Sequence, residues 1–176
     1  YPSVAAVVWA LPPFPMAAMA WLLALSAVFA ATSSEPSSSR FVIAGYAPDY
    51  RLESLDLSAL AHNLTDLLLF SIAPTPQGAI DPGSITQIHH MRAARAKKAA
   101  PHLRALVSMG GGGRSAAFPQ AVGSRHRREA LAKALVKYCK RGKLDGADID
   151  YEAALGPTEL RNLVAFLRLL RQAFDA

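Results

Sequence analysis

Three carboxylates stand at alternate positions near the end of a short apolar run. They are Asp148, Asp150 and Glu152, in the segment DGADIDYE at residues 145–152. In an extended strand alternate side chains share a face, so the three acids line up while the residues between them point the other way. Neighbours in such a row have Cα atoms about 6.5 to 7 Å apart, close enough for their charges to repel in a partly dry interior. A row of this kind is costly to fold, which favours a functional role.

Acid–base catalysis is one use for the row. Cleavage of a glycosidic bond needs an acid that still carries a proton near neutral pH, and a neighbouring carboxylate raises the proton affinity of such a group. Glu152, at the C-terminal end of the run, stands where barrel enzymes carry their chemistry. Two alternatives remain open. One is a divalent-cation site, since carboxylates are hard oxygen ligands, and the other is a solvated edge strand with its acids in water.

The elements that would position the acids alternate between short apolar runs and longer amphipathic ones. Four runs bounded by turn signals predict strands: Phe41–Tyr46, Leu67–Ala73, Leu103–Met109 and Leu144–Tyr151. The first two are almost wholly apolar, which suits parallel strands covered on both faces. Repeated β and α elements predict an α/β fold with right-handed crossovers, either an open doubly wound sheet or part of an eight-stranded barrel.

Three helices are expected between and after these strands. Ser84 should cap a helix whose apolar side carries Ile85, Ile88 and Met91, with His89 and His90 at its surface. A second helix should start at Ser124, run to about Arg141 and end at Gly142. Its inward residues are expected to be Leu131, Leu135, Tyr138 and Cys139. The last helix should open at Pro157, with an apolar face made of Leu160, Leu163, Val164, Leu167, Leu170 and Phe174.

The acidic segment resembles a known signature. DGADIDYE fits the DxxDxDxE pattern of glycoside hydrolase family 18, the chitinase type, at every defined position, and it lies on the fourth predicted strand as it does in that family. Ser108-Met109-Gly110-Gly111 at the end of the third strand resembles the family's SxGG motif. Gly45-Tyr46 resembles the family's opening strand. The resemblance covers about residues 41–176.

The resemblance implies a (β/α)8 TIM barrel, of which about the first four βα units are present, acting on β-1,4-linked N-acetylglucosamine in chitin or its oligosaccharides. Family members retain the anomeric configuration and use the substrate's own acetamido oxygen in place of a protein nucleophile. Carried over, Glu152 would be the general acid and then the base. Asp150 would orient the acetamido group, and Asp148 would share a proton with Asp150. No cofactor and no metal are implied.

Other motif residues have supporting roles in the same resemblance. Asp145 and Ser108 are expected to be structural, and Gly110 and Gly111 to allow a tight turn and close approach to the substrate. Tyr46 is expected to line the sugar site, with a core tyrosine as the alternative. The glycine run does not predict a phosphate loop, because no Gly-Lys-Ser/Thr sequence follows it.

The first forty residues have a different composition. An apolar core at Trp21–Phe29, followed by small residues, predicts a secretory signal over residues 1–30, and a Ser-rich linker follows at 31–40. An uncleaved membrane anchor is the alternative. Secretion would make Asn63, in the sequon Asn-Leu-Thr, a possible glycosylation site. After removal of the signal no membrane association is expected.

The overall charge narrows the possible partners. The chain of 176 residues is 52% hydrophobic with a net charge of +6, which comes largely from residues 92–104 and 125–143, where basic residues alternate with alanines and leucines. This pattern is typical of solvated helix faces. Binding to nucleic acid would also need aromatic stacking residues or a reading motif, and neither is present. With Cys139 as the single cysteine, the fold must hold without an internal disulfide.

One expectation about stability and two rival functions follow from the same residues. Half a barrel would leave two unpaired strand edges, so this piece alone is expected to be unstable or inactive and the natural protein to be longer. A chitinase-like protein that binds sugar without cutting it is one rival reading, although such relatives typically lose an acid of the motif and this sequence keeps them. An endo-β-N-acetylglucosaminidase acting on N-glycans is the other.

Overall fold

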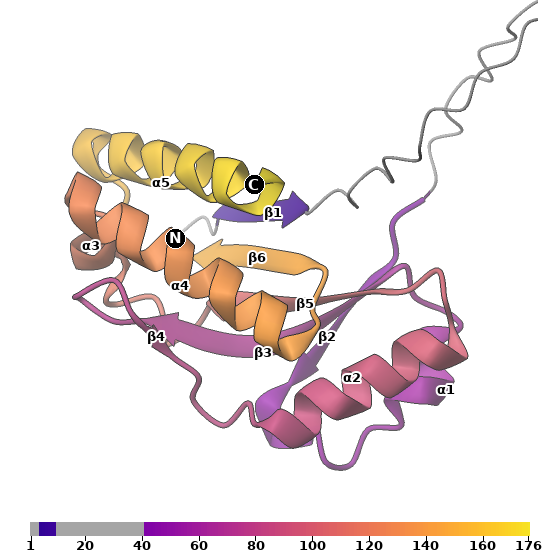
Figure 1. Ribbon diagram of the computed structural model, residues 1–176. Helices are drawn as coiled ribbons and strands as arrows, with labels where there is room; N and C mark the ends of the chain where they lie inside the picture. Colours follow the sequence, from indigo (N-terminus) through magenta and orange to yellow (C-terminus); the bar gives the residue numbers. More distant parts are fainter. Residues whose placement is uncertain (1–3, 10–40) are drawn as a thin grey trace, which may run out of the picture. The chain divides into compact units, whose positions relative to one another are not determined.

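The computed structural model describes residues 4–9 and 41–176 (Figure 1). The apolar segment Trp21–Phe29 and the Ser-rich linker lie outside the described residues, so the signal and the linker stay predictions. Within the described part of the chain, no helix is long and apolar enough to cross a membrane.

A mixed sheet is the centre of the fold. Its strands follow the order β1-β6-β5-β3-β2, and a short strand β4 pairs with β3. Four neighbouring strands are parallel: β2 (Ala44–Pro48), β3 (Asp66–Pro74), β5 (Arg104–Gly110) and β6 (Gly146–Tyr151). Two are antiparallel to their partners: β1 (Val4–Trp9) and β4 (Ile80–Asp81). The four expected strands are therefore present, and their shared direction confirms the α/β prediction.

The first expected strand is shifted along the chain. It begins at Ala44 instead of Phe41, because the main chain of Ile43 forms hydrogen bonds with Thr65 before the regular strand pairing starts. The Thr65 hydroxyl accepts a hydrogen bond from the Ile43 N–H at 2.8 Å, and the Ile43 carbonyl accepts from the Thr65 N–H at 2.9 Å. A side chain that bonds the main chain in this way replaces a ladder partner.

One edge of the parallel strands differs from expectation. Strand β1 lies antiparallel along β6, with Val4 opposite Tyr151 and Trp9 opposite Gly146. Strand β1 belongs to the predicted signal over residues 1–30, so the prediction of an unpaired edge at β6 is contradicted only for the chain that keeps this segment. The physical reason is that an exposed strand edge is a row of free N–H and C=O groups, which any extended segment within reach can satisfy.

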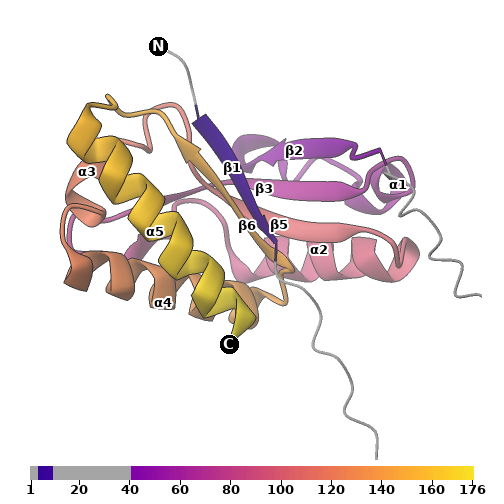
Figure 2. The same cartoon turned by 90° about the horizontal axis from the view of Figure 1, so that it is seen from above.

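The helices follow the strands in chain order. They are α1 (Leu57–Ala61), α2 (Gln87–Ala99), α3 (Phe118–Ala121), α4 (Arg125–Gly142) and α5 (Pro157–Asp175), with a 3-10 turn η1 at Asp49–Arg51. Figure 2 shows α2 and α4 along the same side of the sheet. The core lies between the helices and the sheet face that carries Ala147, Ile149 and Tyr151. The strand alternation predicted for the acidic segment is confirmed.

Helix α2 corrects two expectations. It starts after Thr86 instead of Ser84, and His89 and His90 are buried, with 5% and 9% of their surface exposed. Ile88 and Met91 are instead 65% and 62% exposed. The buried face of α2 also holds Ala93 and Ala96, so the helix docks through small residues that permit a close approach, and the large apolar residues point away. The sequence analysis assigned the buried face by hydrophobicity alone, so it missed the preference for small residues where a helix packs closely.

The buried histidines have partners that account for their burial. The His89 ring nitrogen Nδ1 accepts the Thr86 N–H at 3.1 Å, which closes a capping box at the start of α2. The His90 Nε2 lies 3.2 Å from the Tyr138 hydroxyl on α4. Buried imidazoles are tolerated when their polar atoms are satisfied in this way.

Helix α4 matches the prediction closely. The Ser124 hydroxyl accepts the Arg127 N–H at its start, and Leu131, Leu135 and Cys139 are buried. At its end the left-handed residue is Lys143, with φ of 54°, and not Gly142. Gly142 instead allows α4 to pack closely against α2, since a Cβ there would lie 3.2 Å from the His90 ring.

Helix α5 follows its predicted face only in part. Leu163 and Leu170 are buried, but Leu160 and Val164 are exposed. Phe166, which the predicted face leaves out, is fully buried.

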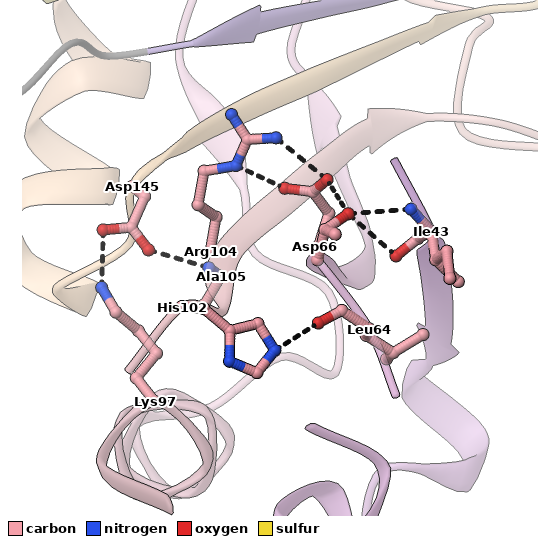
Figure 3. A network of polar contacts seen from close by, with 9 residues as sticks. Ile43, Leu64, Asp66, Lys97, His102, Arg104, Ala105 and Asp145 are labelled. Carbon is pink, nitrogen blue, oxygen red and sulfur yellow. Dashed lines mark hydrogen bonds and ion pairs between the residues drawn. The ribbon is translucent and has the colours of Figure 1, made fainter. Parts of the chain in front are cut away.

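A polar network joins the starts of three strands at one end of the sheet (Figure 3). Asp66, 1% exposed at the start of β3, receives two hydrogen bonds from the Arg104 guanidinium on β5, at 2.7 and 3.0 Å. Asp145, just before β6, accepts from Lys97 Nζ at 2.5 Å and from the Ala105 N–H at 2.8 Å. In barrels the N-terminal ends of the strands carry stability, and the chemistry lies at the opposite end.

This network gives a first prediction. The substitution Asp66→Asn should lower the free energy of unfolding by about 2 kcal/mol, because it removes the charge from a buried carboxylate that accepts two hydrogen bonds from Arg104. Chemical denaturation measures the change. Asp175→Asn, which alters an exposed i,i+4 pair with Arg171, is the matched control and should cost no more than about 0.5 kcal/mol. Equal losses for the two variants would contradict the assigned role.

Candidate active site

The three acids emerge from one face of β6, opposite the face that packs on the helices. Asp148 is fully buried and Asp150 is partly buried. Glu152 follows the last residue of the strand and is exposed. The row therefore runs from the interior of the sheet to its C-terminal edge, which is the edge where parallel α/β folds bind ligands.

Asp148 is held in place by hydrogen bonds from two other strands. Its Oδ2 accepts a hydrogen bond from the Ser108 hydroxyl on β5 at 2.8 Å and one from the Tyr46 hydroxyl on β2 at 3.3 Å. The two strands that carry these donors flank β3, so a single carboxylate joins three strands of the sheet. Its Oδ1 is also buried, and it has no hydrogen-bond partner among the described residues. A buried carboxylate oxygen without a donor favours a form of the group that holds or shares a proton.

The surroundings raise the pKa of both aspartates. Burial raises the pKa of Asp148, while the hydrogen bonds from Ser108 and Tyr46 act in the opposite direction. Burial also raises the pKa of Asp150, and the nearby charges of Glu152 and Asp148 raise it further. The mutual repulsion predicted for the row is therefore present at Asp150, its middle member.

Tyr46 lies at the same site. Half of its surface is exposed, and its ring meets Phe70 edge-to-face with centroids 5.7 Å apart. Burial of the hydroxyl and the negative charge of Asp148 raise the pKa of Tyr46 to about 12. The hydroxyl is thus a hydrogen-bond donor at neutral pH, and half of the residue's surface remains exposed. The alternative of a fully buried core tyrosine does not match this exposure.

The glycines of the SxGG segment are required by the backbone. Gly110 has φ of 105°, and a Cβ there would lie 2.1 Å from the Asp150 carbonyl oxygen. Gly111 has φ of 81°, its N–H donates to the same carbonyl at 2.8 Å, and a Cβ would meet the Phe70 ring at 2.3 Å. Any side chain at either position would push the loop away from β6.

Ser115 is a site residue that the sequence analysis did not identify. Its buried hydroxyl accepts the Glu152 N–H at 3.1 Å and lies 3.0 Å from the Asp150 carbonyl and 3.2 Å from the Gly111 carbonyl. One hydroxyl therefore fixes the main chain on both sides of Tyr151 against the glycine loop. No periodicity marks this serine, because it lies in an irregular turn whose path is set only by the fold.

Arg114 is the second residue of this kind. Its guanidinium donates to the Ser71 carbonyl and to Asp49 Oδ2, the latter at 2.5 Å. The Ser71 hydroxyl in turn donates to the Gly110 carbonyl at 2.7 Å. This chain of contacts ties together the ends of β2, β3 and β5, so the loops around the acids form one connected rim.

The remaining predicted residues lie elsewhere. Asp145 contacts Lys97 and Ala105 at the far end of β6, away from the three acids. Asn63 is exposed in the turn after α1. In the described part of the chain, no group of three or more His, Cys, Asp and Glu side chains is arranged to hold a metal ion.

Comparison with known sequences points to one family. The model of glycosyl hydrolases family 18 matches residues 39–176. Chitinase 1 of Aphanocladium album and endochitinase 1 of Metarhizium anisopliae are each 32% identical to the chain over 80 residues. That alignment covers 46% of this chain and 19% of each relative, so the matched part spans about a fifth of their length.

Solved structures share the fold. A family 18 N-acetylglucosaminidase from Paenibacillus barengoltzii has a TM-score of 0.67 at 26% identity, and a family 18 chitinase from Cycas revoluta in complex with allosamidin has a TM-score of 0.68 at 20% identity. Each match covers 76% of this chain and 40% of the solved one. The parallel strands described above thus match part of the α/β barrel of these enzymes. The match over residues 39–176, with the acidic strand in its place, shows that the chain belongs to glycosyl hydrolases family 18.

Proposed function

We propose that the protein of which this chain is part hydrolyses β-1,4 linkages between N-acetylglucosamine units in chitin or its oligosaccharides, with retention and with help from the substrate's own acetamido group. The single observation that carries the proposal is the acid row at the C-terminal edge of β6. A buried, a partly buried and an exposed carboxyl group follow one another there on one face. The relatives named chitinase and endochitinase support the same substrate class.

In this proposal each acid has a separate task. Glu152, the exposed member, protonates the leaving oxygen and then activates water. Asp150 accepts the acetamido N–H, which turns the acetamido oxygen toward the anomeric carbon. Asp148 shares a proton with Asp150. The orphaned Oδ1 of Asp148 and the raised pKa values of both aspartates support a coupled pair that holds a proton between its members.

Tyr46 and the glycine loop complete the proposed sugar site. The half-exposed Tyr46 offers an aromatic surface for a pyranose ring, and its hydroxyl donates a hydrogen bond to Asp148. Gly110 and Gly111 bring the main chain close to Asp150. Secretion of the protein, and glycosylation at Asn63, belong to the same proposal and rest on the sequence alone.

The test is hydrolysis of chitin oligosaccharides by the whole protein, with Glu152→Gln as the comparison. Activity on these substrates that the variant loses would support the proposal. Binding of the oligosaccharides without cleavage would favour the chitinase-like lectin. Release of sugar from N-linked glycans, with chitin oligosaccharides left intact, would favour the endo-β-N-acetylglucosaminidase.

Ser115 gives a second prediction. In the whole protein Ser115→Ala should lower kcat about tenfold and leave KM within about twofold, since the buried hydroxyl positions the Glu152 main chain. Ser115→Thr keeps the hydroxyl and should recover part of the rate. Steady-state kinetics, with the melting temperature of each variant as the check on folding, distinguish the outcomes. A change confined to KM would contradict a positioning role.

A further inference from the structure

A pocket of about 430 Å³ lies between α2, α4 and β4. Its walls come from residues on the helical side of the sheet, whereas the three acids emerge from the opposite face. The proposed sugar site therefore does not include it, and none of the acids in that site lines it. Ile80 and Ile85 supply apolar surface on one wall, and Tyr138 supplies aromatic surface on another.

The charged residues that line the pocket are both basic. Lys137 and Arg141, one turn apart on α4, both line it, and no Asp or Glu does. Neither cation forms an ion pair with a residue in the described part of the chain. Two cations on the wall of a concave, partly apolar site focus a positive potential into it.

An aromatic pair of buried His90 and partly buried Tyr138 forms one wall of the pocket. His90 and Tyr138 meet edge-to-face with ring centroids 5.2 Å apart, and the His90 Nε2 lies 3.2 Å from the Tyr138 hydroxyl. Gly142 leaves room for the His90 ring at the end of α4, where a Cβ would lie 3.2 Å from it. The wall is thus preformed, which lowers the ordering cost of binding.

From this arrangement we propose that the pocket binds a small organic anion, a carboxylate carried on a compact apolar or aromatic body. The carboxylate lies between Lys137 and Arg141, and the apolar body packs against Ile85 and the ring of Tyr138. Mostly apolar walls with a few convergent polar groups are typical of small-molecule sites. The proposal does not depend on the proposed sugar chemistry.

The test uses sodium benzoate as the probe and benzyl alcohol as its uncharged counterpart, each titrated into the isotope-labelled whole protein. The NMR signals of the His90 and Tyr138 rings should shift and saturate with benzoate. Benzyl alcohol should bind about tenfold more weakly, since each cation contributes about a factor of three. Absence of saturation, or equal affinity for the two probes, would overturn the proposal.

A matched pair of double variants locates the site. Lys137→Gln with Arg141→Gln should weaken benzoate about tenfold. Lys133→Gln with Lys140→Gln removes the same charge from exposed positions of α4 that do not line the pocket, and it should change the affinity by less than about twofold. All four substitutions are at exposed positions, so both proteins should fold, which the amide spectrum checks. Equal weakening by the two variants would show attraction to the net charge of α4 and would overturn a defined site.

Discussion

The substitution Glu152→Gln is expected to lower kcat/KM on N-acetylglucosamine oligosaccharides about 10²- to 10⁴-fold, the range typical of a lost general acid–base. The amide keeps the shape of the side chain but cannot deliver a proton to the leaving oxygen. KM should change little, because Glu152 lies at the exposed end of the row and acts on the bond being broken. Initial rates on a defined oligosaccharide of unmodified N-acetylglucosamine units, whose leaving group needs protonation, give both constants.

Glu129→Gln is the matched control for this experiment. Glu129 is exposed on α4 and pairs only with Arg125 in the described part of the chain. The same chemical change there should leave the rate unchanged. If Glu152→Gln and the wild-type protein cleave the substrate at equal rates, the assignment of the acid is wrong, even if the family and the fold stand.

The substitution Asp150→Asn should have two effects of opposite sign. Activity should fall about 10²-fold or more, because Asn cannot hold the acetamido group with a charged acceptor as the oxazolinium ion forms. Stability near neutral pH should rise, because the negative charge of Asp150 is crowded by Asp148 and Glu152 and partly buried. A gain in stability at the cost of function is characteristic of catalytic carboxylates.

The pH dependence follows from the direction of the shift. The pKa of Asp150 in the folded protein is raised above its ordinary value of 3.8, so the folded state binds the proton more tightly than the unfolded state does. The contribution of Asp150 to stability is therefore greatest below the ordinary pKa and declines as the pH rises through the raised folded value. Asn cannot ionise, so the advantage of Asp150→Asn should be large at pH 7 and small at pH 4.

Melting temperatures at the two pH values measure this difference. Asp81→Asn, at an exposed position of β4, serves as the control for the chemical change itself. A variant that is less stable than the wild-type protein at pH 7 would contradict the crowding that the structure shows. A stable variant with full activity would instead contradict the proposed role of Asp150.

Much of the site could be predicted from sequence because it lies on a single strand. Alternation along β6 places Asp148, Asp150 and Glu152 on one face whatever the neighbouring elements are, and this was confirmed by the burial of Ile149 on the other face. The four strands and the cap at Ser124 were also predictable, since they depend on local periodicity and on one hydrogen bond. Strand ends were less certain, as Ile43 shows.

Residues brought together across distant segments could not be predicted. Ser115 meets Glu152 across 37 positions, and Arg114 meets Asp49 across 65. Helix α2 gives a second example, because its apolar pattern favours a face with Ile88 and Met91, yet the helix buries His89 and His90. Small alanines set how closely it approaches the sheet, and only the packed structure shows which face fits.

The sequence by itself determined the acid row, its strand, its glycine loop and the family they belong to, because each of these depends on the order of neighbouring residues and on backbone conformation. The tertiary structure alone decided which donors hold Asp148, which side of α2 is buried and where the cations of α4 meet an apolar wall. Those features depend on distances between elements far apart in the chain. Such distances follow from the packing of the whole sheet and its helices, which no local pattern encodes.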